Sequence, residues 1–497
     1  MTRLNDMVTY NGLCQTLQGE TAAESEIIMP DYCPGILKLV KTEANSLVRS
    51  QSVRGDRAYV EGVVEFTVSY LSDSADGLQC VTHQVPFSQT TQIRETDSSQ
   101  ISVTARVSYA NARALSPQKL YVKATVETVT NVFAAESITL LDGETANEIE
   151  KKTEQVYLSD VLSVSQKVLK MSDSIEVTGA PVSKILRYET CFAETDKKVI
   201  NNKMIVKADM SLKIIYISAD GSLCTQPAKF PISQVLEIGE AGEDAECVTN
   251  FSMSDCHFNI KDNQGKTTLD CDLEINIGAI CYQNERIEII TDAFSTSKQT
   301  ECVRKPVGIQ KMVSVAKQAD FKQSIQMENC TGILDVSVKP SVMSVAYDAE
   351  QGSIMCQGVF ACGIVYTDTE SDVLCSEKTV PFQVAVDSDI VPTNVRGSVE
   401  LELEDLTHTF DGNDLILSMD TRLKGFVLVG KEYSAVSEIS FTDREEDPAQ
   451  IILCYANCGD DVWDIAKRYG ASPAKIIERN GLSGAQLAEN RMLFIAR

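Results

Sequence analysis

Apolar and polar side chains alternate along much of this chain, as in the stretch VEFTVSY at residues 64–70. Every second residue is apolar, which separates Val64, Phe66, Val68 and Tyr70 from Glu65, Thr67 and Ser69. Successive side chains of a strand point to opposite faces, so this alternation is typical of an antiparallel strand with one buried face. The stretch therefore predicts a strand whose polar face meets water.

Three copies of one pattern follow each other with a period of about 150 residues. In each copy an alternating run ends in a tyrosine, a polar turn follows, and a second run closes on adjacent proline and phenylalanine residues. The tyrosines are Tyr70, Tyr216 and Tyr366, and the second runs start near Cys80, Cys224 and Cys375. A polar turn between two alternating runs predicts a β-hairpin. Because proline cannot donate to a strand ladder, Pro86 and Pro381 are expected at strand ends or on edge strands.

Further alternating runs flank each hairpin, and strands at this spacing usually pack as two sheets. The predicted fold is therefore mainly β, with three tandem antiparallel β-sandwich-like repeats. The charged stretches between the repeats are open to two readings, as strands or as short helices that bridge neighbouring units. We divide the chain into an N-terminal segment (1–26), three β repeats (27–140, 174–298 and 324–441), two connecting segments (141–173 and 299–323), a polar linker (442–450) and a C-terminal module (451–497).

The C-terminal module changes from a strand period to a helical period. Val462, Ile465, Ala466 and Tyr469 recur at the spacing of one helix face, and Asp461 stands where an N-cap is expected. Gly470 is expected to end this first helix. A second helix is predicted to begin after Ser472 and Pro473 and to end at Gly481 with positive φ, and short apolar runs at 451–453 and 492–495 flank the pair. The module therefore predicts a small βααβ domain.

The charge balance bears on possible partners. Acidic residues outnumber Lys and Arg by 71 to 45, for a formal net charge of −26. This disfavours nucleic acid and anionic membrane surfaces, both of which attract clustered positive charge. Residues 451–497 hold six Lys or Arg against five acids, so the module is +1 and residues 1–450 are −27. The start of the chain has no apolar signal-like core and no run of eighteen apolar residues occurs, so we expect a cytosolic protein without membrane insertion.

Few residues suggest reaction chemistry or metal binding. The 16 cysteines form no Cys-x-x-Cys pair, and the three histidines form no cluster, so neither a metal nor another cofactor is expected. In a reducing cytosol the thiols are expected to be mostly small buried side chains. No nucleotide-binding, metalloprotease or serine-hydrolase motif occurs. We therefore expect a protein that is not an enzyme, with no catalytic residues.

The C-terminal module resembles a LysM domain. The matching residues are Gly459, Asp460, Trp463, Asp464, Ile465, Ala466, Tyr469, Gly470, Asn480, Leu487, Leu493 and Ile495. The resemblance implies a shallow groove for N-acetylglucosamine polymers between the loops 459–462 and 481–487. The implied partner- or glycan-binding residues are Gly459, Asp460, Asp461, Val462, Trp463, Gly481, Leu482, Ser483, Gly484 and Leu487. Two alternatives stay open: Trp463, the only tryptophan, serves in packing or in partner contact, and Asp460 and Asp461 serve as caps or as ligands.

The three β repeats are similar to the SPOCS domains of spore-coat proteins, through their Gly-Ile-Leu entries, tyrosine-ended hairpins and Pro/Phe closures. SPOCS repeats ahead of a C-terminal LysM domain imply a coat assembly scaffold in the mother cell that is recruited to the forespore surface. The implied partner of the LysM domain is a coat morphogenetic ATPase that polymerises there. Self-association is left open. The alternative is a protein that binds peptidoglycan through the LysM groove, and a wall hydrolase with a LysM targeting domain ranks last.

Overall fold

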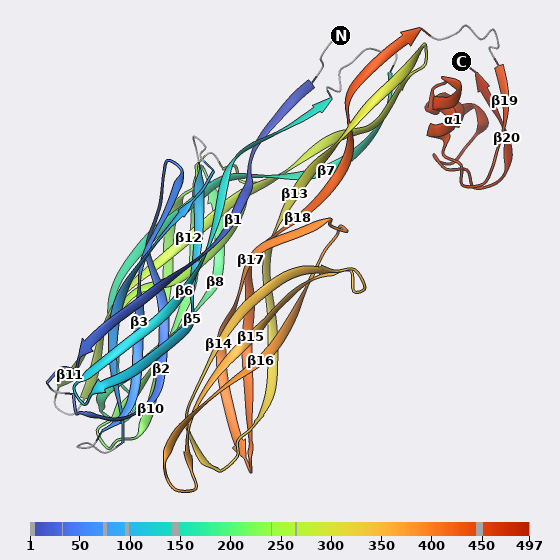
Figure 1. Cartoon of the computed structure of the whole chain (residues 1–497). Helices are drawn as coiled ribbons and strands as arrows, with labels where there is room; N and C mark the ends of the chain where they lie inside the picture. Colours follow the sequence, from blue (N-terminus) through green and yellow to red (C-terminus); the bar gives the residue numbers. More distant parts are fainter. Residues whose placement is uncertain are drawn as a thin grey trace.

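The computed structural model describes residues 5–31, 33–72, 77–94, 99–141, 149–239, 241–263, 266–443 and 451–496. Nearly all of these residues lie in antiparallel strands, and the two helices among them lie near the carboxyl end (Figure 1). The mainly β fold predicted from the alternation is confirmed.

The first β-sandwich is built from two three-stranded sheets. One sheet has the order β1-β6-β5 and the other the order β2-β3-β4. The strands are β1 (Asn5–Ile28), β2 (Ile36–Arg54), β3 (Arg57–Ser72), β4 (Leu78–Gln92), β5 (Gln100–Ser116) and β6 (Lys119–Leu141). Val64 and Phe66 of β3 pack in one buried cluster with Val122 and Ala124 of β6, so the two apolar faces form a single core.

The second and third sandwiches repeat this topology, with sheet orders β11-β12-β7 and β10-β9-β8, then β13-β18-β17 and β14-β15-β16. The second contains β7 (Ile149–Glu176), β8 (Val182–Ile200), β9 (Lys203–Ser218), β10 (Leu223–Glu237), β11 (Glu246–Asn263) and β12 (Lys266–Ser295). The third contains β13 (Lys298–Gln326), β14 (Cys330–Asp348), β15 (Ser353–Asp368), β16 (Val373–Asp387), β17 (Asn394–Asp411) and β18 (Asp414–Asp443).

The segments that the sequence pattern set apart from the repeats also lie in strands. Described residues of the N-terminal segment form most of β1, and those of the two connecting segments form most of β7 and β13. Each of these strands pairs with the long sixth strand of its own sandwich, namely β6, β12 or β18. The first strand of each sandwich therefore comes mostly from residues that the sequence analysis placed before the repeat.

The three predicted hairpins are confirmed as β3-β4, β9-β10 and β15-β16. Pro86 and Pro381 lie in β4 and β16, which are edge strands of their three-stranded sheets, as predicted for residues without an N–H donor. Tyr70 and Tyr216 are fully buried, and each hydroxyl donates to a backbone carbonyl ahead of the neighbouring strand, at Pro34 and Ala180. The hydroxyl groups of Tyr70 and Tyr216 therefore hold the backbone in place just before β2 and β8.

Strand β3 differs from its prediction, because its polar face is not in water. Glu65, Thr67 and Ser69 are buried as well as the apolar residues between them. Glu65 accepts a hydrogen bond from Gln84 of β4, and Gln84 also bonds Asp255 of β11, in the second sandwich. The polar face is therefore covered by a neighbouring sandwich, which alternation along one strand does not reveal.

The cysteines also differ in one respect from the expectation of reduced thiols. Cys247 of β11 and Cys281 of β12 form a disulfide. The two residues are direct cross-strand partners with Cα atoms 4.2 Å apart, and antiparallel pairing brings such side chains together. The free cysteines among the described residues are mostly buried or partly buried.

All three sandwiches meet at a buried charge cluster. In each sandwich a β-bulge follows the residue opposite the repeated tyrosine, and it places Lys41, Arg187 and Asp335 at equivalent positions of β2, β8 and β14. Asp335 accepts from both Arg187 and Lys41, with the Lys41 Nζ 3.4 Å from its Oδ2. Lys41 and Asp335 are each 7% exposed. We call Lys41, Glu43, Arg187 and Asp335 the junction cluster.

Glu43 makes the stability that the junction cluster contributes depend on pH. Burial disfavours its charged form, yet the charges of Lys41 and Arg187 outweigh burial and lower its pKa to about 2. A carboxylate with a lowered folded pKa stabilises the fold above its unfolded pKa, and this contribution is lost as pH falls through the folded value.

We expect about 3 kcal/mol of stability from Glu43 to disappear between pH 4.5 and 2. Urea unfolding at a series of pH values measures this loss, and the Glu43→Gln variant should lack that part of the pH dependence. An identical acid slope in the variant and the parent chain contradicts the assignment.

The sandwiches lie beside one another, and their longest strands continue together toward the C-terminal module (Figure 1). Along this extension a buried cluster combines Tyr10 and Leu140 of the first sandwich, Leu158 and Ile289 of the second, and Ile309 of the third. The three units therefore share an apolar core as well as the junction cluster, and they contact each other over much of their length.

The C-terminal module has the predicted βααβ order, with β19 (Ile451–Ala456), α1 (Val462–Tyr469), α2 (Pro473–Asn480) and β20 (Arg491–Ala496). Val462, Ala466, Ile476 and Leu493 lie in its buried core. Gly470 and Gly481 end the two helices in the left-handed region, as predicted, with φ of 64° and 60°. Most of the predicted linker, residues 444–450, lies outside the described residues.

Candidate functional site

The two predicted binding loops lie against each other. The N–H of Gly459 donates to the carbonyl of Leu487 at 2.8 Å, and the N–H of Leu487 donates back to Asp460 at 3.0 Å. The N–H of Val462 donates to the carbonyl of Ala485 at 2.8 Å. The structure thus brings residues 459–462 together with the end of the loop 481–487, as the LysM resemblance implies.

The predicted site residues divide by exposure. Gly459, Gly481, Ser483 and Gly484 are exposed, and Asp460, Asp461 and Leu482 are partly exposed. Val462, Trp463 and Leu487 are buried. The exposed members offer mainly backbone groups and small side chains, while the buried members belong to the module's core.

The two aspartates bond the turn and the helix start. The Asp460 side chain accepts from the N–H of Asn457 at 2.8 Å, and the Asp461 side chain accepts from the N–H of Trp463 at 2.9 Å, as an N-cap does. The other oxygen of Asp461 lies 2.7 Å from the Nζ of Lys152, in β7. Burial opposes the charged form of Asp461, yet the bonds from Lys152 and from the Trp463 N–H lower its pKa.

Replacing Asp461 with alanine is expected to destabilise the module by about 0.5–2 kcal/mol, the range for a lost N-cap. The Trp463 N–H loses its side-chain acceptor, and Lys152 loses its partner. Thermal unfolding followed by tryptophan fluorescence measures the change. Asp464→Ala, at an exposed acid in the first turn of α1, is the matched control. An equal loss in both variants contradicts the capping role.

Trp463 is only 8% exposed and contacts the second sandwich. Its indole N–H donates to the Oδ2 of Asp292 at 2.8 Å. Its ring meets the ring of Phe294 edge to face, with centroids 5.0 Å apart. In this structure Trp463 therefore serves in packing and in a contact within the chain.

Among the described residues outside the module, Lys152, Asp292 and Phe294 contact it, and the sequence did not predict these contacts. A β-bulge in β12 lies between Ile290 and Asp292. This irregularity becomes visible only once the pairing register of the strand is known. Phe294 is buried in the module's cluster although it lies more than 150 residues earlier in the chain. No local pattern links these residues to the C-terminal domain.

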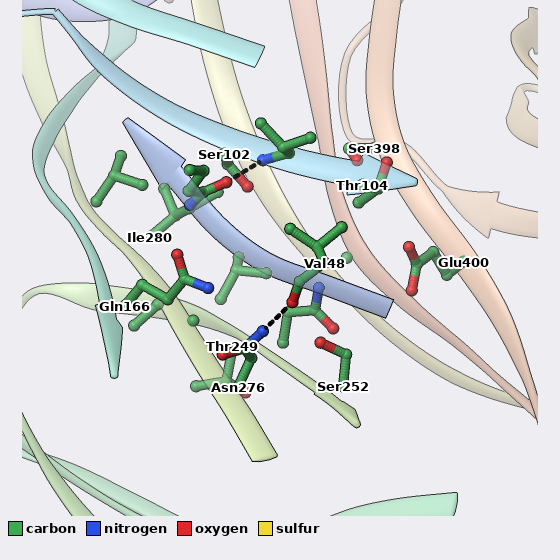
Figure 2. Close-up of a pocket in the computed structure, with 18 of the residues that line it drawn as sticks. Val48, Ser102, Thr104, Gln166, Thr249, Ser252, Asn276, Ile280, Ser398 and Glu400 are labelled. Atoms are coloured by element: carbon green, nitrogen blue, oxygen red, sulfur yellow. Dashed lines mark hydrogen bonds between the residues drawn. The ribbon is translucent and has the colours of Figure 1, made fainter. Parts of the chain in front are cut away.

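A second candidate is a cavity of about 220 Å³ between the three sandwiches. Its lining includes Ser102 and Thr104 of β5, Thr249 and Ser252 of β11, and Glu400 of β17 (Figure 2). One amide in it, that of Asn276, donates to the backbone carbonyl of Val48. The cavity is lined by apolar side chains as well as hydroxyl and amide groups, and all of them belong to the contact between the units.

Among the described residues, no group of three or more His, Cys, Asp or Glu side chains could hold a metal ion. No helix in the described part of the chain is long and apolar enough to cross a membrane.

Comparison with family models finds two kinds of domain. The model described as the SipL, SPOCS domain matches residues 35–115 and 181–261, and the LysM domain model matches residues 458–496. No curated protein and no solved structure matches the chain. The chain therefore carries two regions that match the SPOCS domain of the SipL type and a C-terminal LysM domain, as the sequence motifs indicated. The matched SPOCS regions lie in the first two of the three repeats predicted from the sequence.

The matched SPOCS regions start just before β2 and β8 and end within or at the close of β5 and β11. They cover the hairpin sheet of the first and second sandwiches and one strand of the facing sheet. SipL-type SPOCS and LysM domains suggest a sporulation-related protein, and such domains are generally non-catalytic. LysM domains commonly bind peptidoglycan or N-acetylglucosamine glycans.

Proposed function

We propose that this chain is a non-enzymatic scaffold of the spore envelope, and that its LysM domain docks onto a coat morphogenetic ATPase at the forespore surface in the mother cell. The observation that carries the proposal is the presence of SPOCS and LysM domains in one chain. The contacts among the three sandwiches add support, because shared cores and the junction cluster suit a rigid spacer.

A polymeric partner suits a single small docking domain. A surface that repeats the same site retains a weak binder through effective concentration, so no tight single site is needed. The exposed docking residues fit this requirement, since Gly459, Gly481, Ser483 and Gly484 offer a small surface rather than a deep cleft.

The glycan alternative uses the same loops, and it draws on the usual ligands of LysM domains. Asp461 weighs against it, because its charged side chain would be desolvated beside a neutral sugar. The carboxylate is already bonded to Lys152 and to the N–H of Trp463.

Co-sedimentation of the full chain with the polymerised ATPase tests the proposal, with a chain ending at residue 450 as the matched control. We expect saturable binding by the full chain, little by the shortened chain, and no saturable binding of chitin oligomers by either. Saturable oligomer binding by the full chain, without co-sedimentation, would instead establish the glycan reading. Equal co-sedimentation of both chains would place the docking site in the sandwiches.

A further inference from the structure

The carboxylate of Asp292 makes several of the contacts that hold the LysM domain against the rest of the chain. The Oδ1 of Asp292 lies 2.7 Å from the Nζ of Lys467 and 2.6 Å from a guanidinium nitrogen of Arg304. Its Oδ2 accepts from the indole N–H of Trp463. Asp292 thus joins two side chains of α1 to a side chain of β13.

A second ion pair and an aromatic contact complete the attachment. Lys152 of β7 bonds Asp461 at the start of α1, and Phe294 of β12 lies in the domain's buried cluster against Trp463. We call the contact of Lys152, Asp292 and Phe294 with Asp461, Trp463 and Lys467 the latch. It is supplied by two strands of the second sandwich and by the domain's first helix.

The latch uses residues of the predicted docking surface. Asp461 and Trp463 belong to the loop and helix start that the LysM resemblance assigns to ligand binding, and both are engaged by the second sandwich. Resting on the function proposed above, we propose that the latch masks the Asp461 and Trp463 part of the docking surface in the free chain, and that the partner binds tightly only after the LysM domain is released. The glycines and Ser483 of the two loops stay exposed in the latched chain.

The forces in the latch suit a reversible contact. The side chains of Lys152, Arg304 and Lys467 are 47%, 42% and 35% exposed, and ion pairs with such exposure contribute little each. Phe294 adds one buried aromatic contact, and an interface this small permits relative motion of the domains by default. Only residues 444–450 separate β18 from β19. The released domain therefore stays at high effective concentration near the latch residues of the second sandwich.

Charge favours the closed arrangement over long range as well. The module is +1 and the remainder of the chain is −27, so the latch brings opposite net charges together. Burial opposes the charge on Asp292, yet the hydrogen bonds from Lys467 and Trp463, with the charges of Lys467 and Arg304, lower the pKa of Asp292. Asp292 thus stays an anion at neutral pH, as the latch requires.

Fluorescence of the full chain tests the latch directly, because Trp463 is the sole tryptophan. Asp292→Asn removes the charge that holds Lys467 and weakens the acceptor for the indole. We expect a red shift of the emission and easier quenching by acrylamide in this variant. Asp272→Asn is the matched control, since Asp272 is an exposed acid of the same strand that bonds Ser172. The control should keep the parent spectrum.

Co-sedimentation with the polymerised ATPase then tests masking. If the open form makes up about one-tenth of the free chain, full opening tightens apparent binding about tenfold. Asp292→Asn should therefore bind more tightly than the parent chain, and Asp272→Asn should not. An unchanged Trp463 spectrum in Asp292→Asn would overturn the latch, and a shifted spectrum with unchanged affinity would overturn masking.

The two proposals fail in different ways. If neither the parent chain nor the Asp292→Asn variant co-sediments with the ATPase, the proposed docking function is wrong. The fluorescence result still decides whether the latch exists. The charge-reversed pair Asp292→Lys with Lys467→Asp gives a second check on folding. The latch predicts that the Lys467→Asp single variant opens the contact and that the pair partly restores the parent spectrum.

Discussion

Replacing Asp335 with alanine is expected to lower the free energy of unfolding by about 3–5 kcal/mol, the usual effect of removing one partner from a buried ion pair. Asp335 is the shared acceptor of Lys41 and Arg187, which come from two other sandwiches. Without it the positive charges of Lys41 and Arg187 remain close together in the junction cluster, paired with Glu43 and Glu189. Urea unfolding of the full chain measures the loss.

The expected loss is specific to the junction. Asp389→Ala is the matched control, because the side chain of Asp389 is 92% exposed and its one ion pair with Lys311 spans 3.9 Å. That variant should stay within about 0.5 kcal/mol of the parent chain, as surface substitutions usually do. A change of the same small size for Asp335→Ala would show that the junction cluster does not hold the sandwiches together.

Replacing Trp463 with alanine is expected to abolish recruitment to the polymerised ATPase and to destabilise the LysM domain by about 3–5 kcal/mol, as loss of a large buried aromatic does. The substitution removes the edge contact with Phe294 and opens a cavity beside the core residues of α1. Hydrogen exchange at β19 and β20 measures the local stability, and co-sedimentation measures recruitment.

A second variant separates binding from folding. Trp463→Phe keeps an aromatic ring beside Phe294 but has no N–H to donate to Asp292. We expect this variant to retain most of the domain's protection from exchange while its latch weakens. Recruitment by a folded Trp463→Ala chain at the parent level would show that Trp463 takes no part in docking.

Much of the local structure could be predicted because it depends on neighbours in the chain. The alternation around Tyr70 and its two counterparts predicts the hairpins, and the helical spacing from Val462 to Tyr469 predicts the apolar face of α1. The left-handed residues Gly470 and Gly481 were also predictable, since helix ends favour glycine there. Each of these features follows from backbone geometry over a few residues.

The binding loops could be predicted only in part. The LysM resemblance places residues 459–462 near residues 481–487, and backbone hydrogen bonds join the two loops. It leaves open whether Trp463 faces a partner or the protein itself. The contact with Asp292 joins residues 171 apart in the chain, so no local pattern carries it.

By itself, the sequence determined that the chain is mainly β, where the three hairpins and the two C-terminal helices lie, and that it carries SPOCS and LysM domains, because period, capping and turn chemistry act over short distances. Only the tertiary structure decided that the polar face of β3 is buried, that Lys41, Arg187 and Asp335 meet, and that α1 rests on β12. The physical reason is that a polar face has the same alternation whether water or another sandwich covers it. Whether water or a second sandwich covers that face depends on packing between segments that are far apart in the chain.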